Sequence, residues 1–133
     1  MLQAHQRLTT QMDQELRKRH GLQLDWYDVL YQLNHAGGRM RMHELAASTL
    51  FSRTDTTRLV DRMERVGLVQ REPAAEDRRG VYAVATAEGQ ALFRRAAATH
   101  LEDIQQLFGA HVTADEAKAM AEGLGRAIQA GEG

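Results

Sequence analysis

The sequence predicts a mainly helical fold with one small β hairpin, built as a single domain. Three observations support this fold class. Apolar residues recur three and four positions apart along most of the 133 residues, as on one face of a helix. Two short β-like runs, 68–72 and 81–85, interrupt that pattern on either side of a charged turn. The single proline leaves long helices free to form, and 43% hydrophobic residues suffice for one core.

The first 38 residues predict two helices. The first, about 2–20, has apolar residues four apart and ends in a basic run before Gly21. The second, about 25–36, is expected to be capped by Asp25 and ends at a pair of glycines. Their apolar faces comprise Leu8, Met12 and Leu16 in the first helix and Trp26, Val29, Leu30 and Leu33 in the second.

The middle of the chain predicts a helix-turn-helix. A short extended stretch at 39–42 leads into a helix of barely two turns, about 43–50, which ends in a tight break. Ser52 then opens a longer helix, about 52–66, as a capping box with Asp55, and a glycine ends it. A short helix, a tight turn and a longer helix with a polar face are the parts of a helix-turn-helix.

The remainder predicts a hairpin and two long helices. The hairpin, about 68–85, has a charged and protruding tip. Thr86 is expected to cap a helix over 87–108, and Thr113 with Glu116 forms a capping box for the last helix. These helices carry long apolar stripes, which favour pairing in a homodimer over folding back within a monomer. The stripes consist of Ala97, Leu101, Ile104 and Phe108 in one helix and Ala117, Met120, Leu124 and Ile128 in the other.

Composition excludes several classes of function. The chain has no cysteine, so disulfides, thiolate metal ligands and cysteine nucleophiles are absent. It lacks an apolar run long enough for a membrane span and the apolar block of a signal peptide, so we expect a cytoplasmic protein. We expect no enzyme and no cofactor, because phosphate loops, nucleophile elbows and paired catalytic carboxylates are missing. The six histidines show no metal-ligand spacing, although a zinc site assembled from distant segments stays open.

Charge is distributed unevenly along the chain. Residues 39–82 carry nine arginines against seven acidic residues, whereas 1–38 is neutral and 83–133 is acidic. The planar guanidinium of arginine suits phosphate oxygens and guanine edges. Taken alone, this segment has two interpretations. Its arginines bind nucleic acid, or they form an arginine-rich surface that only faces solvent.

The chain resembles the MarR family of bacterial winged-helix transcription regulators (multiple antibiotic resistance regulators) over nearly its whole length. The resemblance is carried by Glu44-Leu45-Ala46, Ser52 with Thr57 through Glu64, Gly67-Leu68-Val69, Arg71, Asp77-Arg78-Arg79, and the pair Thr86 and Gly89. It implies an obligate homodimer in one MarR-like domain, 1–133. Residues 25–86 would form the DNA-binding part, and 1–22 and 87–130 the dimerisation helices. The implied interface includes Leu8, Met12, Leu101, Ile104, Phe108, Met120, Leu124 and Ile128.

The predicted recognition helix has the residue types that a major-groove helix needs, namely short polar and arginine side chains on one face. In the hairpin, or wing, we expect Asp77 to brace a guanidinium or cap the turn, which leaves an arginine for the minor groove. The alternative is that the tip of the hairpin is only mobile and charged, with no role in DNA binding. The predicted DNA contacts are Ser52, Arg53, Thr54, Thr56, Thr57, Arg58 and Arg62 of the helix and Asp77, Arg78 and Arg79 of the wing.

We therefore predict a sequence-specific binder of double-stranded DNA, a homodimeric repressor of a pseudopalindromic operator that a small aromatic or anionic ligand releases. The resemblance implies a ligand crevice between the dimerisation and DNA-binding parts. Its expected lining is Arg7, Trp26, Tyr27, Tyr31 and His35. A winged-helix protein-interaction module without DNA binding is the alternative, because the charge of residues 39–82 is nearly balanced. Salt-dependent binding of duplex DNA would separate the two functions.

Overall fold

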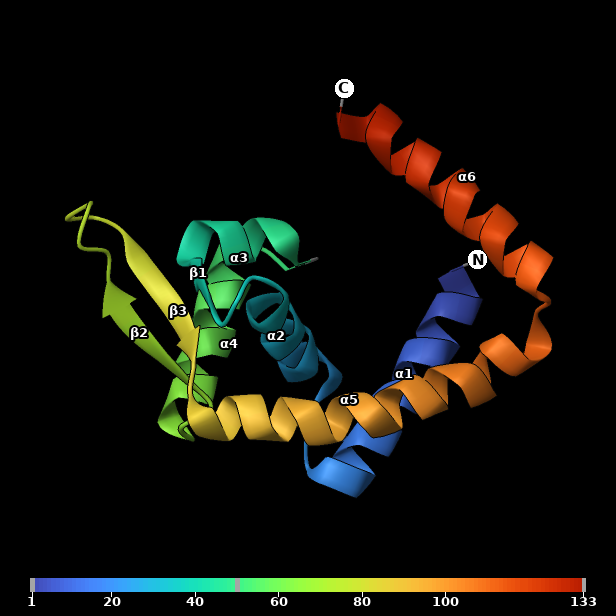
Figure 1. Ribbon diagram of the computed structural model, residues 1–133, viewed down its shortest axis with the longest axis horizontal. Helices are drawn as coiled ribbons and strands as arrows, with labels where there is room; N and C mark the ends of the chain where they lie inside the picture. The colour runs from blue at the N-terminus through green and yellow to red at the C-terminus, as the bar shows by residue number, and fades with distance from the viewer. Residues whose placement is uncertain (1, 50, 133) are drawn as a thin grey trace.

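The computed structural model describes residues 2–49 and 51–132, except for the side chains of Ile128 and Glu132. Within these residues the fold is mainly helical with a small antiparallel sheet, as predicted (Figure 1). The helices are α1 (Leu2–His20), α2 (Leu24–His35), α3 (Met42–Ser48), α4 (Arg53–Arg65), α5 (Ala87–Leu107) and α6 (Ala114–Glu132), with a 3₁₀ turn at Gly109–His111. The strands are β1 (Arg39–Arg41), β2 (Val69–Pro73) and β3 (Val81–Ala85).

Two of the predicted caps form fully, and both are local. The Thr86 hydroxyl accepts a hydrogen bond from the Gly89 amide at 3.0 Å at the start of α5. Thr113 and Glu116 exchange two hydrogen bonds, of 3.0 and 3.1 Å, in a complete capping box before α6. These contacts satisfy N–H groups that the first turn of a helix otherwise leaves unpaired.

The prediction that Asp25 caps α2 is wrong. The helix begins at Leu24 with Gln23 at the cap position, so Asp25 already lies in the first turn and accepts from the Trp26 amide at 2.9 Å. The Leu24 amide instead donates to Asp13 of α1, also at 2.9 Å. A side chain from another helix therefore replaces the local cap.

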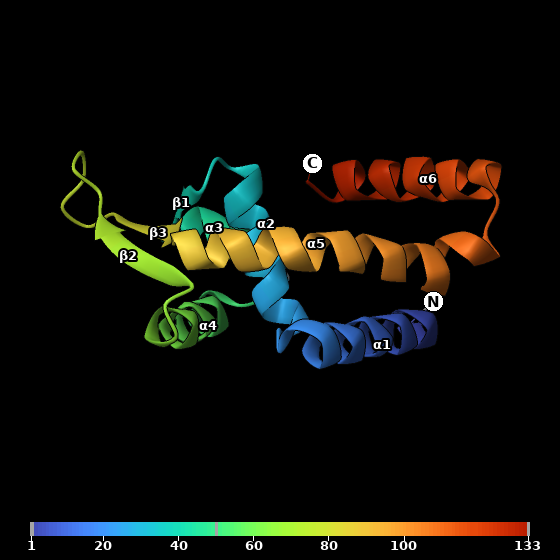
Figure 2. The same ribbon diagram turned by 60° about the horizontal axis from the view of Figure 1, so that its bottom comes forward.

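The sheet has strand order β1-β3-β2, with both pairs antiparallel. β3 lies in the centre, and its Tyr82 pairs with Arg41 of β1 on one side and Glu72 of β2 on the other. The hairpin of β2 and β3 projects from one end of the molecule (Figure 2). Gly67 lies at φ +80° between α4 and β2, a conformation that favours glycine.

One apolar core joins the end of α1, α2, α3, α4, the sheet and the first half of α5. Burial of each large apolar side chain contributes about 1.5–3 kcal/mol. The pair Thr86 and Gly89 ties α5 to this core, because the Thr86 hydroxyl donates to the Gly67 carbonyl at 2.6 Å. A Cβ at Gly89 would collide with the Leu68 carbonyl. The fully buried residues include Leu30, Leu33, Leu45, Val60 and Met63.

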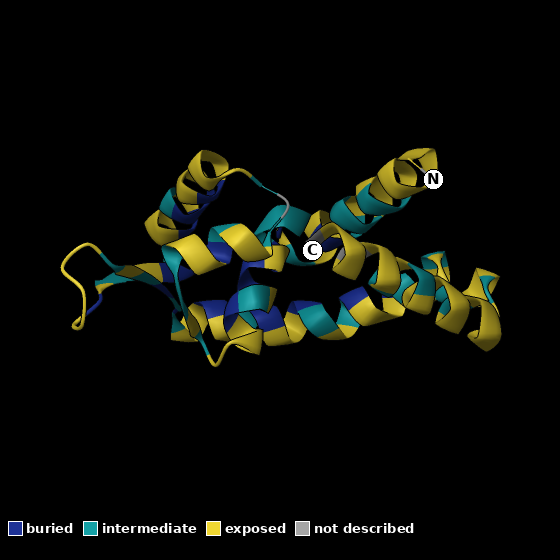
Figure 3. Cartoon of the chain, turned by 90° about the horizontal axis from the view of Figure 1, so that it is seen from above, coloured by how far each residue is buried: buried dark blue, intermediate teal, exposed yellow. Residues whose placement is uncertain are grey.

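The helical end of the molecule is packed far less completely. α1 packs against α5 and α2, and both Leu16 of α1 and Leu22, which follows the helix, are buried. α6 leaves the far end of α5 and diverges from it (Figure 1), and none of its described side chains is buried (Figure 3). None of the described helices is long and apolar enough to cross a membrane.

Candidate nucleic-acid interface

α4, the predicted recognition helix, is fixed at its start by a side-chain cap. The Ser52 hydroxyl accepts a hydrogen bond from the Asp55 amide at 3.1 Å, as predicted. The return bond, from the Ser52 amide to the Asp55 carboxylate, does not form within the described residues, so the capping box is half formed. Leu59, Val60 and Met63 anchor the helix in the core. The exposed residues of its N-terminal half and middle include Arg53, Thr54, Thr57, Arg58 and Arg62.

Thr56 points inward, unlike the other predicted contact residues of α4. Its side chain is fully buried, and its hydroxyl donates to the Ser52 carbonyl at 2.9 Å. The hydroxyl also lies 3.4 Å from that of Thr49, which follows α3. Because Thr56 joins α4 to the end of α3, we leave it out of the proposed DNA-contact surface.

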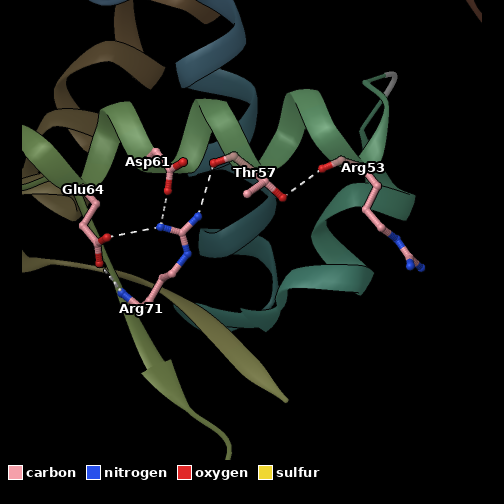
Figure 4. Close-up of polar contacts among 5 residues, drawn as sticks. All are labelled: Arg53, Thr57, Asp61, Glu64 and Arg71. Atoms are coloured by element: carbon pink, nitrogen blue, oxygen red, sulfur yellow. Dashed lines mark hydrogen bonds and ion pairs between the residues drawn. The ribbon is translucent and has the colours of Figure 1, made fainter. Parts of the chain in front are cut away.

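Arg71 on β2 holds the wing against α4 (Figure 4). Its guanidinium donates to Asp61 at 2.5 Å, to Glu64 at 3.2 Å and to the Thr57 carbonyl at 3.2 Å. The Arg71 amide donates to the second oxygen of Glu64 at 2.8 Å. A planar guanidinium that makes several bonds at once fixes orientation as well as charge. Arg71 therefore sets the position of the wing relative to α4 and offsets one of the two negative charges of Asp61 and Glu64.

A second cluster, at the wing tip, covers the carboxylate of Glu76. Arg41 at the end of β1 donates to Glu76 at 2.9 Å, and the Tyr82 hydroxyl donates to the same oxygen. The hydrogen bond from Tyr82 contributes most to lowering the pKa of Glu76, and Arg41 adds to it. The guanidinium of Arg39 lies 4.0 Å from the centre of the Tyr82 ring, so cations flank this tyrosine.

Asp77 performs both of the tasks predicted for it. One of its oxygens accepts a hydrogen bond from the Arg79 amide at 3.0 Å, which caps the turn. The other oxygen pairs with Arg41 at 3.4 Å. The guanidinium that Asp77 braces thus comes from β1, and the guanidinium of Arg79 stays without an ion pair within the described residues.

The ion pairs of Arg71 and Arg41 determine which charged side chains of this surface stay unpaired. Arg41 and Arg71 bind four of the acidic side chains between residues 39 and 82, namely Asp61, Glu64, Glu76 and Asp77. The exposed arginines of the predicted interface have no ion pair in the part of the chain that the structure describes. They are Arg53, Arg58 and Arg62 on α4 and Arg78 and Arg79 on the wing.

A cavity of about 340 Å³ separates the wing from α3 and α4. Its lining includes Arg41, Arg53, Arg71 and Arg79, with Asp77 as the acidic member. Figure 4 shows the guanidinium of Arg53 turned away from the Arg71 cluster. A concave surface lined by one sign of charge concentrates the opposite charge, which suits the phosphates of a duplex.

Sequence reasoning missed Arg41 and gave Arg71 no structural role. The partners of Arg41 lie 35 and 36 residues away, and only the pairing of β1 with β3 brings them together. The extended stretch at 39–42 was the available signal, since a strand beside an acidic hairpin tip can supply its cations. Asp61 and Glu64, three residues apart on one helix, were the corresponding signal for Arg71.

A larger cavity, of about 660 Å³, lies between α1, α2 and the segment that joins α3 to α4. Of the predicted ligand residues, Tyr31 lines it, whereas Arg7 and His35 are exposed outside the lining. Trp26 and Tyr27 belong to the core instead. The Tyr27 ring packs against that of His100, with 4.5 Å between the centroids. The lining is His5, Thr9, Thr10, Asp13, Arg17, Leu24, Asp25, Asp28, Tyr31, Gln32, Ser48, Thr49 and Phe51.

Acidic groups outnumber basic groups around this larger cavity. Asp13 pairs with Arg17 at 2.7 Å, which uses the lining's one arginine. Partial desolvation, followed by repulsion from Asp25, raises the pKa of Asp28 to about 6. The cavity is therefore better suited to an uncharged aromatic molecule than to an anion at neutral pH.

The predicted dimer residues lie at the helical end, and most are partly or fully exposed. Leu8, Met12 and Ile104 are half-buried. Leu101 is 65% exposed and Leu124 is 50% exposed. Phe108 and Met120 are also exposed, and the side chain of Ile128 lies outside the described residues.

Comparison with known proteins places this arrangement in a family. The sequence profile of the MarR family matches residues 20–80. The chain is 35% identical over 99 residues to a homoprotocatechuate degradative operon repressor from Escherichia coli. That match covers 74% of this chain and 66% of the length of the repressor.

Two solved structures from Streptomyces coelicolor share the fold. AbsC, a MarR family transcriptional regulator, superimposes with a TM-score of 0.91 at 30% identity, over 96% of this chain and 86% of AbsC. A second MarR family regulator, solved in complex with DNA, has a TM-score of 0.90 at 30% identity, over 98% and 81% of the two chains. The match therefore includes the wing, the recognition helix and the long helices. The chain belongs to the MarR family of winged-helix transcriptional regulators, which are not enzymes.

Proposed function

We propose that this chain acts as a homodimeric repressor, which binds a pseudopalindromic operator and is released by a small aromatic ligand. The observation that carries the proposal is the distribution of charge on the wing and α4. Asp61, Glu64, Glu76 and Asp77 pair with Arg41 and Arg71, while the exposed arginines of α4 and the wing have no ion pair in the part of the chain that the structure describes. Although the net charge of residues 39–82 is nearly balanced, their unpaired arginines form an exposed basic face. Such a face favours DNA binding over a protein-interaction role.

The polar face of α4 has the chemistry of major-groove recognition. Arg53, Arg58 and Arg62 reach guanine edges or phosphates, while the hydroxyls of Thr54 and Thr57 contact phosphates or thymine methyl groups. The wing extends beside the recognition helix, so that Arg79 approaches the adjacent minor groove. The family relative solved with DNA supports this assignment of the interface.

A second copy of the chain completes the helical end. Exposed apolar residues on α5 and α6 bury apolar area only when another molecule covers them, and a two-fold pair of chains satisfies both copies at once. Residues 1–22 and 87–130 are the proposed dimerisation helices. Two recognition helices related by this symmetry read half-sites about one helical turn, or 10 base pairs, apart.

Binding to a labelled duplex from the intergenic region upstream of the gene tests the proposal. Fluorescence anisotropy at two salt concentrations, with scrambled duplex as competitor, should show selective binding that weakens as salt rises. Arg58→Ala should reduce affinity about tenfold or more, because one arginine contact to DNA contributes about 1–3 kcal/mol. Arg94→Ala, at an exposed position of α5, is the matched control and should bind as wild type. Binding no better than to scrambled duplex from any candidate region would favour the interaction-module alternative.

The larger cavity is the proposed ligand site. Its position between α1, α2 and the residues just before α4 allows an occupant to shift α4 relative to the dimerisation helices. The relationship to a repressor of an aromatic degradation operon supports an aromatic ligand. Neutral phenols should raise the melting temperature of the wild type but not that of Tyr31→Ala. The absence of a thermal shift across neutral phenols and aromatic acids would contradict this assignment.

A further inference from the structure

We propose that Arg41 is a positioning residue for the wing: it pairs with both Glu76 and Asp77 and thereby holds Arg79 in place for DNA. The inference rests on the proposed function, because it concerns how the wing is prepared for a duplex. Arg41 lies on β1, outside both the recognition helix and the hairpin. Its role is thus distinct from that of the arginines that contact DNA.

The acidic residues of the wing tip create the need for such a residue. Glu76 and Asp77 are exposed and lie close in sequence to Arg78 and Arg79, where uncompensated carboxylates would repel phosphates. Arg41 donates to both carboxylates, at 2.9 and 3.4 Å. One guanidinium therefore pairs with both carboxylates and lowers the net charge of this cluster from −2 to −1.

The contacts of Arg41 also define the shape of the wing tip. Asp77 accepts from Arg41 through one carboxylate oxygen and from the Arg79 amide through the other. The turn is closed by hydrogen bonds from the Gly80 amide to the Asp77 carbonyl, 3.1 Å, and from the Ala74 amide to the Gly80 carbonyl, 2.9 Å. Asp77 therefore links the position of Arg41 directly to the backbone of Arg79.

The guanidinium fits closely against this turn. A Cβ on Gly80 would lie 3.0 Å from the Nη1 atom of Arg41 and 2.9 Å from the Cβ of Ala74. The Arg41 side chain is 23% exposed, and its guanidinium lies 5.5 Å from the centre of the Tyr82 ring. Its donors are directed at the carboxylates, which distinguishes Arg41 from the exposed arginines that remain available to phosphates.

A mutant cycle separates positioning from direct contact with DNA. The cycle compares Arg41→Ala in the wild type with Arg41→Ala in a background that carries Glu76→Gln and Asp77→Asn. Both background changes remove charge but keep an acceptor, for the Tyr82 hydroxyl and the Arg79 amide respectively. The controls are Arg94→Ala, which removes a positive charge elsewhere, and Arg41→Lys, which keeps the charge without the planar fork.

We expect Arg41→Ala to weaken operator binding about tenfold in the wild type and less than about twofold in the neutral background, since interacting residues are not additive. Arg41→Lys should recover part of the affinity. An equal loss in both backgrounds, together with a salt slope lower by about 0.9, would show a direct phosphate contact and overturn the proposal. Wild-type affinity of Arg41→Ala in the wild-type background would overturn it as well.

Hydrogen exchange on the free protein tests the inference independently of DNA. Arg41→Ala should speed exchange at the amides of Ala74, Arg79 and Gly80, whereas amides of α5 should keep their wild-type rates. Unchanged exchange at these three amides would contradict the positioning role. If the wild type fails to bind any operator, the proposed function fails, and the exchange measurement still decides whether Arg41 holds the wing.

Discussion

The winged-helix half of the molecule, α2 to β3, and its helical end, formed by α1, the second half of α5 and α6, bury their apolar side chains to different extents. In the winged-helix half, Leu33, Leu45, Val60 and Met63 are fully buried in one chain. No described side chain of α6 is buried, and Leu124 on that helix is 50% exposed. The comparison indicates that the winged-helix half buries its core within a single chain, whereas the helical end leaves apolar side chains exposed, which the proposed second copy would cover.

The largest expected effect comes from breaking the helical end. Leu124→Arg places a charge on the exposed apolar stripe of α6, so we expect the dimer to dissociate. Operator affinity should fall by about 100-fold, because two linked half-sites bind far more tightly than one. Sedimentation velocity at micromolar concentration and anisotropy with the operator measure the two effects.

Glu122→Arg is the matched control for this change, since it introduces the same residue on the exposed polar face of α6. It should stay dimeric and keep wild-type affinity. A wild type that sediments as a monomer, or a Leu124→Arg variant that stays dimeric and binds normally, would contradict the comparison.

An intermediate effect is expected from Arg71, which joins the wing to α4 in the winged-helix half. Arg71→Met removes the guanidinium bonds to Asp61 and Glu64, keeps the bond from its backbone amide to Glu64, and leaves both carboxylates without a cation beside the proposed DNA-contact surface. We expect a loss of about 1 kcal/mol in the free energy of unfolding, the upper part of the range for partly exposed ion pairs. Operator affinity should fall about tenfold, while sedimentation still shows a dimer.

Arg65→Met, an exposed change in the last turn of α4, is the control for Arg71. It should alter stability by less than about 0.5 kcal/mol. Equal effects of the two substitutions on stability and affinity would show that the bridge between β2 and α4 is unimportant.

The smallest expected effect is a pH dependence of stability that comes from the helical end. There, His100 and Asp103 of α5 are buried. Burial lowers the pKa of His100, and Asp103 opposes that shift. The unfolded chain, with an ordinary histidine pKa of 6.5, therefore takes up the proton first. The free energy of unfolding should decrease as the pH falls below about 6.5 toward the lowered pKa.

Urea denaturation at pH 7.5 and 5.5 tests this dependence. His100→Gln should show a smaller decrease between the two pH values than the wild type, whereas His43→Gln, at an exposed position of α3, should match the wild type. An identical decrease in His100→Gln would assign the dependence to other groups.

The features that the sequence predicted well depend on neighbours a few residues away. Ser52, Thr86 and Thr113 cap helices through hydrogen bonds to amides three residues later, so their spacing alone reveals them. Asp25 failed as a cap because Asp13, on another helix, binds the amide at the start of α2. A tertiary contact thus replaced the local one, and local patterns do not report such contacts.

The site could be predicted only in part for the same reason. The polar face of α4 was evident from helical spacing, but the inward direction of Thr56 depends on the packing of α3. Arg41 meets Glu76 only after β1 joins the hairpin. The predicted ligand residues were chosen as aromatic or basic, whereas the larger cavity is lined mainly by polar side chains of several segments.

The most direct test of the contrast between the two halves is sedimentation of the wild-type protein with its operator duplex. We expect a free dimer and a complex of two chains per duplex, which forms selectively over scrambled DNA and weakens as salt rises. A monomer that binds the operator with the same affinity and with one chain per duplex would contradict the account.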